Sequence, residues 1–169
     1  MDATADAEFT EFMLACWPRM VRLGYALTGD RGFGEDLAQT ALAKAYASWP
    51  RVARAGNPEA YVRKIVVNAS RDNFRKRHVY EVLTASLPDV MTGDQGTPEQ
   101  RSALFAALMT LPAGQRAVVV LRYWLDLTET ETAAAVGCSV GNVKSQASRA
   151  LAKLRLSAEL TDEVSHEHR

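Results

Sequence analysis

The chain of 169 residues has few of the side chains that metal sites and disulfides require. It contains two cysteines, Cys16 and Cys138, and three histidines. The cysteines form no close pair and have no histidine near them, so we expect neither a metal site nor a disulfide framework. The sequence contains no pair of carboxylates in a catalytic setting, no histidine cluster and no glycine-rich loop that would bind phosphate. We therefore expect no catalytic residue, no cofactor and no small-molecule substrate, and hence no enzyme.

Long apolar runs are also missing. No stretch approaches the roughly 20 residues that span a bilayer. Residues 1–9 are acidic and lack the basic-then-apolar pattern of a signal peptide. We expect a cytoplasmic protein without membrane insertion. Strand-like alternation is scarce and no internal repeat occurs, whereas nearly every long segment has helical spacing, which predicts an all-α protein.

Net charge is absent too, because 20 Lys and Arg residues balance 20 Asp and Glu residues. The distribution is nevertheless uneven: residues 1–40 carry seven acids and three bases, and residues 51–80 carry eight bases and two acids. Residues 81–100 carry four acids and no Lys or Arg. Such a chain can hold DNA with its basic surfaces and a basic protein surface with its acidic ones.

The first half of the chain shows helical spacing in three stretches, over residues 9–28, 33–49 and 58–77. Pro18 is expected to kink the first helix or divide it. Trp49-Pro50 is expected to end the second, with a short basic loop over residues 51–56. Asn57 as N-cap, followed by a proline, predicts the start of the third. The inward side of the second helix is expected to contain Leu37, Ala41, Leu42, Ala45 and Tyr46.

The third predicted helix has two faces. Its apolar side contains Tyr61, Val62, Ile65, Val66 and Ala69. Its opposite side contains Lys64, Asn68, Arg71, Phe74 and Arg75. A basic stripe with an aromatic residue suits a nucleic-acid strand, since cations meet phosphates and rings stack on bases. A solvated cationic face is the alternative, and it is disfavoured here because a separate DNA-binding motif follows.

Residues 81–98 combine turn formers and acids with weak periodicity, which predicts a linker between two domains. Beyond the linker, helices are expected over residues 99–110 and 113–125, with Leu111-Pro112 between them.

Residues 128–155 carry the most informative pattern. Thr128 and Glu131 have the spacing of a capping box. Gly137 can end a short helix with a positive φ, and Ser139 offers a second N-cap, from which a second helix runs to the end of the segment. Two helices joined in this way are typical of a helix-turn-helix.

The second of these helices is also two-faced. Its apolar side contains Val143, Ala147, Ala150, Leu151 and Leu154. Residues 140–156 include four bases and no acid. Short polar groups flanked by cations suit the major groove of DNA, where amides and hydroxyls reach base edges and cations meet phosphates. An ordinary amphipathic helix is the alternative.

The order of these parts resembles a bacterial RNA polymerase sigma factor of the extracytoplasmic-function group (group IV of the sigma-70 family). LPAGQRAVVVLRYWLDLTETETAAAVGCSVGNVKSQASRALAKLR (residues 111–155) is similar to region 4. GEDLAQTALAKAYASW (34–49) is similar to region 2.2, and NPEAYVRKIVVNASRDNFRKR (57–77) to regions 2.3 and 2.4. TALAKAY, NPEAYVRKI and VGNVKSQASRAL are most similar to the SigE-like actinobacterial subfamily.

The resemblance implies two small helical domains joined by a flexible linker. A sigma-2 domain would occupy residues 1–80 and a sigma-4 domain residues 99–158. Residues 81–98 would be the linker and residues 159–169 an acidic tail.

The resemblance also implies three sets of contact residues. The −35 element would be read by Asn142, Lys144, Ser145, Gln146, Ser148 and Arg149. The −10 element would be held by Arg51, Arg54, Asn57, Lys64, Asn68, Arg71 and Arg75. Core polymerase would be contacted by Asp36, Gln39, Leu42 and Lys44. The aromatic residues near the −10 set, Trp49, Tyr61 and Phe74, are expected in the core rather than as stacking platforms.

Such a protein would bind the clamp helices and the flap of the large subunits of core RNA polymerase. It would direct the enzyme to promoter DNA and help to open the −10 region. An anti-sigma factor holds many relatives inactive and is left open here as a further partner. The other function class is a dimeric LuxR-like regulator, which TETETAAAVG and VGNVKS also resemble, although that alternative gives the basic helix over residues 58–77 no role.

Overall fold

The computed structural model describes the backbone of residues 2–77 and 98–167 and the side chains of residues 2–72 and 103–159. Across these residues the elements are helices and no strand occurs, which confirms the all-α prediction. The chain divides into two compact units, Met1–Asp89 and Val90–Arg169. None of the described helices combines the length and the apolar character needed to cross a bilayer.

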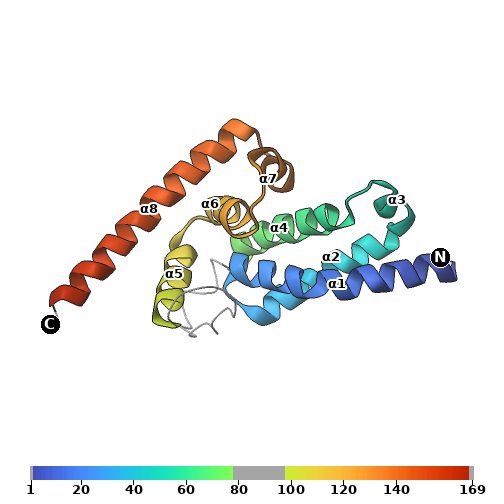
Figure 1. Ribbon diagram of the computed structural model, residues 1–169, viewed down its shortest axis with the longest axis horizontal. Helices are drawn as coiled ribbons and strands as arrows, with labels where there is room; N and C mark the ends of the chain where they lie inside the picture. The colour runs from blue at the N-terminus through green and yellow to red at the C-terminus, as the bar shows by residue number, and fades with distance from the viewer. Residues whose placement is uncertain (1, 78–97, 168–169) are drawn as a thin grey trace. The chain divides into compact units, whose positions relative to one another are not determined.

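The first unit is built on three helices that pack against one another, with a short helix at one end (Figure 1). Its described elements are α1 (Ala3–Thr28), α2 (Arg31–Ala47), α3 (Trp49–Arg54) and α4 (Pro58–Arg77). Side chains at helical spacing fill the core between them: Cys16, Met20, Leu23, Leu37, Ala41, Val62 and Val66. Burial of this stripe from each helix is the main favourable contribution to the fold.

Helix α1 continues through Pro18 as one helix, so the predicted alternative of a division there is wrong. The helix also begins before residue 9, because Asp2 caps it by accepting a hydrogen bond from the Ala5 N–H at 2.8 Å. Pro18 is exposed, whereas Cys16 and Met20 on either side of it are buried. Packing of the buried face therefore holds together a helix that a proline alone would weaken.

The predicted basic loop over residues 51–56 is largely helix α3, and Trp49-Pro50 begins this helix. A proline is tolerated in the first turn of a helix because the N–H that it lacks has no intrahelical partner there. Trp49 and Val52 are both buried and anchor the short helix to the unit. Helix α2 correspondingly ends at Ala47, and it begins at Arg31 because Asp30 caps it.

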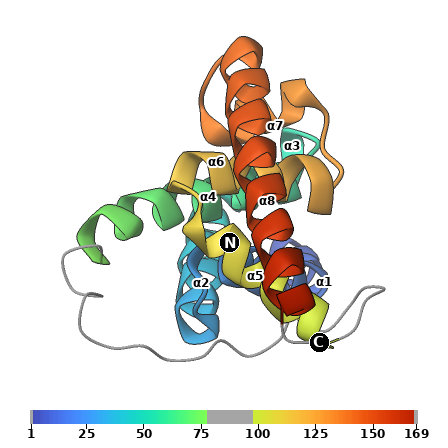
Figure 2. The ribbon, with the colours of Figure 1, turned by 90° about the vertical axis from the view of Figure 1, so that its left-hand side faces the viewer.

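The second unit is assembled around one long helix (Figure 2). Its described elements are α5 (Pro98–Thr110), α6 (Ala113–Val119), the π-helical turn η2 (Val120–Trp124), α7 (Glu129–Val136) and α8 (Val140–Glu167). Helices α6 and α7 both pack against α8. Val118, Leu121, Val143 and Ala150 are fully buried in this core.

Two boundaries in this unit differ from prediction. The helix expected over residues 113–125 changes to π geometry at Val120, where the Leu125 N–H donates to the Val120 carbonyl at 3.0 Å. The helix expected to end at residue 155 runs to Glu167, so most of the predicted acidic tail has a helical backbone. No glycine or proline occurs between these two residues to stop it.

Candidate nucleic-acid interface

The helix-turn-helix of the second unit is built by local hydrogen bonds that the sequence predicted. The Thr128 Oγ1 accepts from the Glu131 N–H at 3.1 Å, and the Glu131 Oε2 accepts from the Thr128 N–H at 2.8 Å. This confirms the capping box at the start of α7. Gly137 has a φ of 79° and donates its N–H to the Ala133 carbonyl at 2.8 Å, which ends α7.

The second helix of the motif is started by Ser139. Its Oγ accepts from the Asn142 N–H at 3.1 Å, and α8 begins at Val140 as predicted. A serine N-cap fixes the first turn of the helix by satisfying one of its free N–H groups. The first turns of α8 therefore have a defined direction relative to α7, which packs beside them (Figure 1).

Helix α8 separates the residues predicted to read DNA from those that hold the helix in place. Val143, Ala147 and Ala150 are buried against the rest of the unit. Five of the six predicted −35 residues are exposed and the sixth is half-buried. In the order of the chain these are Asn142, Lys144, Ser145, Gln146, Ser148 and Arg149, of which Gln146 is half-buried. An exposed row of amides, hydroxyls and cations is chemically suited to base edges and phosphates.

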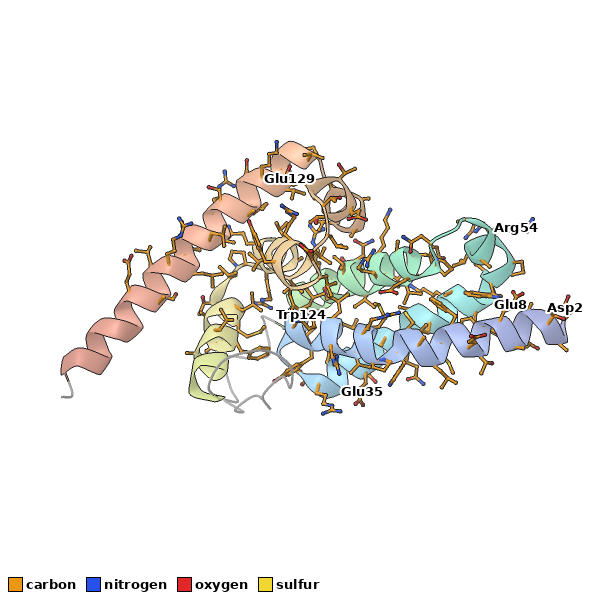
Figure 3. All side chains as sticks on the ribbon, in the orientation of Figure 1. Asp2, Glu8, Glu35, Arg54, Trp124 and Glu129 are labelled. Atoms are coloured by element: carbon orange, nitrogen blue, oxygen red, sulfur yellow. The ribbon has the colours of Figure 1, made fainter. Side chains whose placement is uncertain are left out.

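One acidic side chain that the sequence analysis did not single out lies beside this surface. The Glu129 Oε2 is 3.6 Å from the Lys144 Nζ, so the carboxylate of α7 faces a cation of α8. Glu129 is labelled in Figure 3, at the end of the unit where α7 meets α8. The two residues are fifteen positions apart, and no helical periodicity relates them. Only the packing of the two helices brings them together.

The predicted −10 residues lie on α3, α4 and the turn between these helices. Most of them have exposed side chains in the first unit: Arg51, Arg54, Asn57, Lys64 and Asn68. Arg71 is half-buried, and the side chains of Arg75 and Phe74 lie outside the described residues. The exposed members are three cations and two amides, which lie on α3, on α4 and in the turn between them.

Two of these residues also have structural partners. The Asn57 Oδ1 accepts from the Ala60 N–H at 3.0 Å and caps α4, as predicted. The Arg54 Nε donates to the Pro50 carbonyl at 2.7 Å, which links the two ends of α3. The local geometry of the loop and short helix is therefore held partly by the residues that are predicted to meet DNA.

The aromatic residues near this surface are mostly internal. Trp49 is buried, and its ring lies 5.2 Å from that of Phe9 and 5.1 Å from that of Phe12, between ring centroids. The expectation that Trp49 belongs to the core is confirmed. Tyr61 is half-buried. Tyr46, which was expected to point inward, is largely exposed, and its hydroxyl donates to the Asp6 Oδ1 at 3.0 Å.

The predicted polymerase contacts on α2 do not all lie on one surface. Asp36, Gln39 and Lys44 are exposed. Leu42 is 3% exposed and belongs to the core of the unit. Its assignment to the polymerase contact is therefore wrong for the folded chain, since Leu42 lies on the same inward side of α2 as Leu37.

The described residues hold no group of three or more His, Cys, Asp or Glu side chains placed to bind a metal ion.

Two family models match the two halves of the chain. The model of sigma-70 region 2 matches residues 13–79, and that of sigma-70 region 4 matches residues 101–154. The chain is 38% identical over 156 residues to the RNA polymerase sigma-E factor of Streptomyces antibioticus, covering 92% of this chain and 87% of that protein. It is 34% identical over 175 residues to the ECF RNA polymerase sigma factor ShbA of Streptomyces griseus subsp. griseus, covering 91% and 90%.

A solved structure agrees with these matches. The sigma factor RpoE from Bartonella quintana, in complex with the anti-sigma factor NepR, is similar with a TM-score of 0.72 at 26% identity. The similarity covers 90% of this chain and 97% of that chain. The alternative of a LuxR-like regulator gains no support, since the matched regions in both halves of the chain are those of sigma factors. The chain belongs to the sigma-70 family of RNA polymerase sigma factors, in the extracytoplasmic-function group.

Proposed function

We propose that this sigma factor directs core RNA polymerase to promoters through the two polar, cationic surfaces of its separate units. The surface on α8 reads the −35 element, and the surface on α3 and α4 holds the −10 element as it opens. The observation that carries the proposal is the row of exposed polar and basic residues on the second helix of a capped helix-turn-helix.

Reading of the −35 element follows from the chemistry of α8. The Arg149 guanidinium can donate two parallel hydrogen bonds to guanine, and the Asn142 amide can pair with adenine in the same way. Lys144 suits a phosphate, which positions the helix without carrying sequence information. Ser145, Gln146 and Ser148 add short polar groups, and the shape of the −35 DNA contributes to recognition beside them.

Holding of the −10 element follows from the cationic surface of the first unit. Arg51 and Arg54 on α3 and Lys64 on α4 meet the backbone of the separated strand, because phosphate contacts supply affinity without sequence preference. Asn57 and Asn68 offer amides to an unpaired base. Arg71 and Arg75 continue the same helix and complete the predicted set.

Core polymerase is proposed to bind the exposed side of α2 through Asp36, Gln39 and Lys44, leaving buried Leu42 out of the contact. The polymerase holds both units at the separation of the promoter elements, which raises their effective concentration on DNA. The solved relative is bound to an anti-sigma factor, and we expect a partner of that kind for this chain. The protein is proposed to act in the cytoplasm without catalysis of its own.

Run-off transcription with core polymerase tests this function. We expect the protein to direct initiation from promoters that carry both elements. Arg149→Ala should lower −35-dependent initiation about tenfold or more, as expected for loss of a bidentate base contact, with unchanged binding to core polymerase.

Arg155→Ala is the matched control, because Arg155 is an exposed cation further along α8 and outside the proposed contact set. If core binding and promoter use fell together in Arg149→Ala, the assigned role of Arg149 would be wrong. If RNA output were the same with and without the protein, the proposed function itself would be wrong.

A further inference from the structure

The carboxylate of Glu129 and the ammonium of Lys144 form a loose and accessible ion pair. Their separation of 3.6 Å exceeds that of a hydrogen bond between N and O. The side chains are 38% and 64% exposed, respectively. Solvent and salt reach such a pair, and it contributes little to stability. A competing anion can therefore take the ammonium from the carboxylate.

The start of α7 is a favourable position for the acidic side chain of Glu129. Glu129 is the first residue of α7, where the free N–H groups and the helix dipole favour an acidic side chain. The next acid, Glu131, is engaged in the capping box through its bond to the Thr128 N–H. Glu129 is thus the acid whose ion pair reaches the DNA-facing side of α8.

We propose that Glu129 is an internal competitor for the phosphate contact of Lys144 and keeps the sequence-independent DNA affinity of the recognition helix low. The inference depends on the proposed function, in which Lys144 meets a phosphate. When α8 enters the major groove, a DNA phosphate displaces the Glu129 carboxylate from the ammonium. The released carboxylate then lies close to DNA and repels it. Both effects oppose binding to any duplex, whatever its sequence.

The consequence concerns where the protein binds. A sigma factor meets a large excess of non-promoter DNA, and cationic contacts alone do not distinguish it from promoters. Because Glu129 weakens one phosphate contact on every sequence, base contacts and the polymerase must supply more of the affinity. The pair therefore reduces unproductive binding by the free chain.

Binding of the full-length protein to two short labelled duplexes tests the proposal, one of mixed sequence and one with a −35 element. We expect Glu129→Gln to tighten binding to both duplexes about two- to fivefold at low salt, the range of an exposed ion pair. Lys144→Gln should weaken binding to both and reduce the slope of log K against log salt by about one. In the double variant, the gain from Glu129→Gln should be clearly smaller than in the wild-type background, because only the repulsion between the carboxylate and DNA is then removed.

Glu8→Gln is the control for net charge, since Glu8 is exposed on α1 in the other unit (Figure 3). It should leave both affinities unchanged. Glu129→Asp keeps the charge at the start of α7 on a shorter side chain, and should tighten binding less than Glu129→Gln. Circular dichroism should show the same helix content for all variants.

Four results would overturn the proposal. If Glu129→Gln tightens binding equally in the Lys144→Gln background, Glu129 acts by long-range charge and not through this cation. If Glu129→Gln changes the affinity for the −35 duplex alone, the Glu129–Lys144 pair contributes to recognition of the bases and not to sequence-independent binding. If it has no effect while Lys144→Gln weakens binding, the competition is absent but the DNA-binding function stands. Loss of any effect of Lys144→Gln would contradict the proposed −35 contact as well.

Discussion

Gly24 on α1 and Gly34 on α2 face each other where the backbones of the two helices approach closely. A Cβ atom on Gly24 would lie 2.7 Å from the Cα of Gly34, and one on Gly34 would lie 2.7 Å from the backbone N of Tyr25. These distances are shorter than any relaxed contact of a Cβ atom. The two glycines therefore set the spacing of α1 and α2.

We expect Gly24→Ala to lower the free energy of unfolding of the first unit by about 1–3 kcal/mol, because the atoms that it meets are backbone and cannot rotate away. Urea denaturation followed by circular dichroism measures the change. Gly32→Ala is the matched control, since its Cβ would meet only the Asp30 Oδ1, at 3.6 Å. That exchange should raise stability by about 0.5–1 kcal/mol through helix propensity. Equal stability of Gly24→Ala and the wild type would contradict the close approach.

Arg116 is a buried cation that joins α5 to α6. Its guanidinium donates to the carbonyl oxygens of Leu108, Met109 and Leu111 at 3.1, 2.9 and 3.0 Å, at the C-terminal end of α5. Carbonyl groups at the C-terminal end of a helix favour a cation, because the helix dipole is negative there. We expect Arg116→Ala to destabilise the second unit by about 3 kcal/mol, since charged hydrogen bonds are lost and buried acceptors remain.

Thermal denaturation of Arg116→Ala, compared with Arg155→Ala on the surface of α8, measures this role. Arg155→Ala should stay within about 0.5 kcal/mol of the wild type. A similar small effect in both variants would show that the buried guanidinium does not hold the two helices.

The contribution of the capping box at the start of α7 to the stability of the helix-turn-helix can be measured directly. We expect Thr128→Ala to destabilise the second unit by about 1 kcal/mol, because the Glu131 N–H loses its acceptor. Thr128→Ser should retain most of that stability. Thr130→Ala, at an exposed site inside the same helix, is the control and should cost nothing by denaturation. Destabilisation by Thr130→Ala equal to that by Thr128→Ala would argue against the cap.

Substitutions at Leu42 and Gln39 on α2 should distinguish an effect on stability from an effect on polymerase binding. We expect Leu42→Ala to lower the free energy of unfolding by about 2–5 kcal/mol, as is usual for a truncated core leucine. Gln39→Ala should change stability by less than about 0.5 kcal/mol while weakening association with core polymerase. Melting temperature and co-purification with the core enzyme measure the two effects. Full stability of Leu42→Ala would contradict its burial.

The two cysteines should differ in reactivity. Burial, followed by the nearby Glu59 carboxylate, raises the pKa of the Cys16 thiol from 9.0 to about 11. Cys138 is only half-buried. Because the thiolate is the reactive form, we expect a maleimide or disulfide reagent to modify Cys138 first in the native protein at neutral pH. Cys138→Ser should remove the fast phase, and denaturant should expose Cys16. Fast labelling of Cys16 in the native chain would contradict its burial.

The raised pKa of the Cys16 thiol in the folded chain also predicts that stability depends on pH. The unfolded chain releases the Cys16 proton near pH 9, whereas the folded chain retains it to about pH 11. The stability contributed by this group is therefore full below pH 9 and falls as the pH rises towards 11. Cys16→Ala should flatten this part of the profile, as measured by urea denaturation across that range.

The features that the sequence predicted correctly are local ones. Thr128 with Glu131, Ser139 and Asn57 each cap a helix through a hydrogen bond to a backbone N–H three residues away. Such bonds need only the right side chain at the right spacing. The helical stripes that fill both cores depend likewise on the period of the helix, which the order of apolar residues in the sequence specifies.

The predictions that failed at α3 and α2 depended on features beyond local spacing. Pro50 is compatible with a helix end and with a helix start, and burial of Trp49 and Val52 decides for the start. Leu42 was placed inward by helical spacing and outward by resemblance to a family. The core of the folded unit settles that disagreement in favour of spacing.

The sequence by itself determined an all-helical chain with two cationic surfaces and a capped helix-turn-helix, because helix period, capping and charge are properties of neighbouring residues. Only the tertiary structure decided which glycines set the contact of α1 and α2 and which carboxylate meets Lys144. Those relationships join residues on different helices. They follow from how side chains fill the space between helices, which no local spacing specifies.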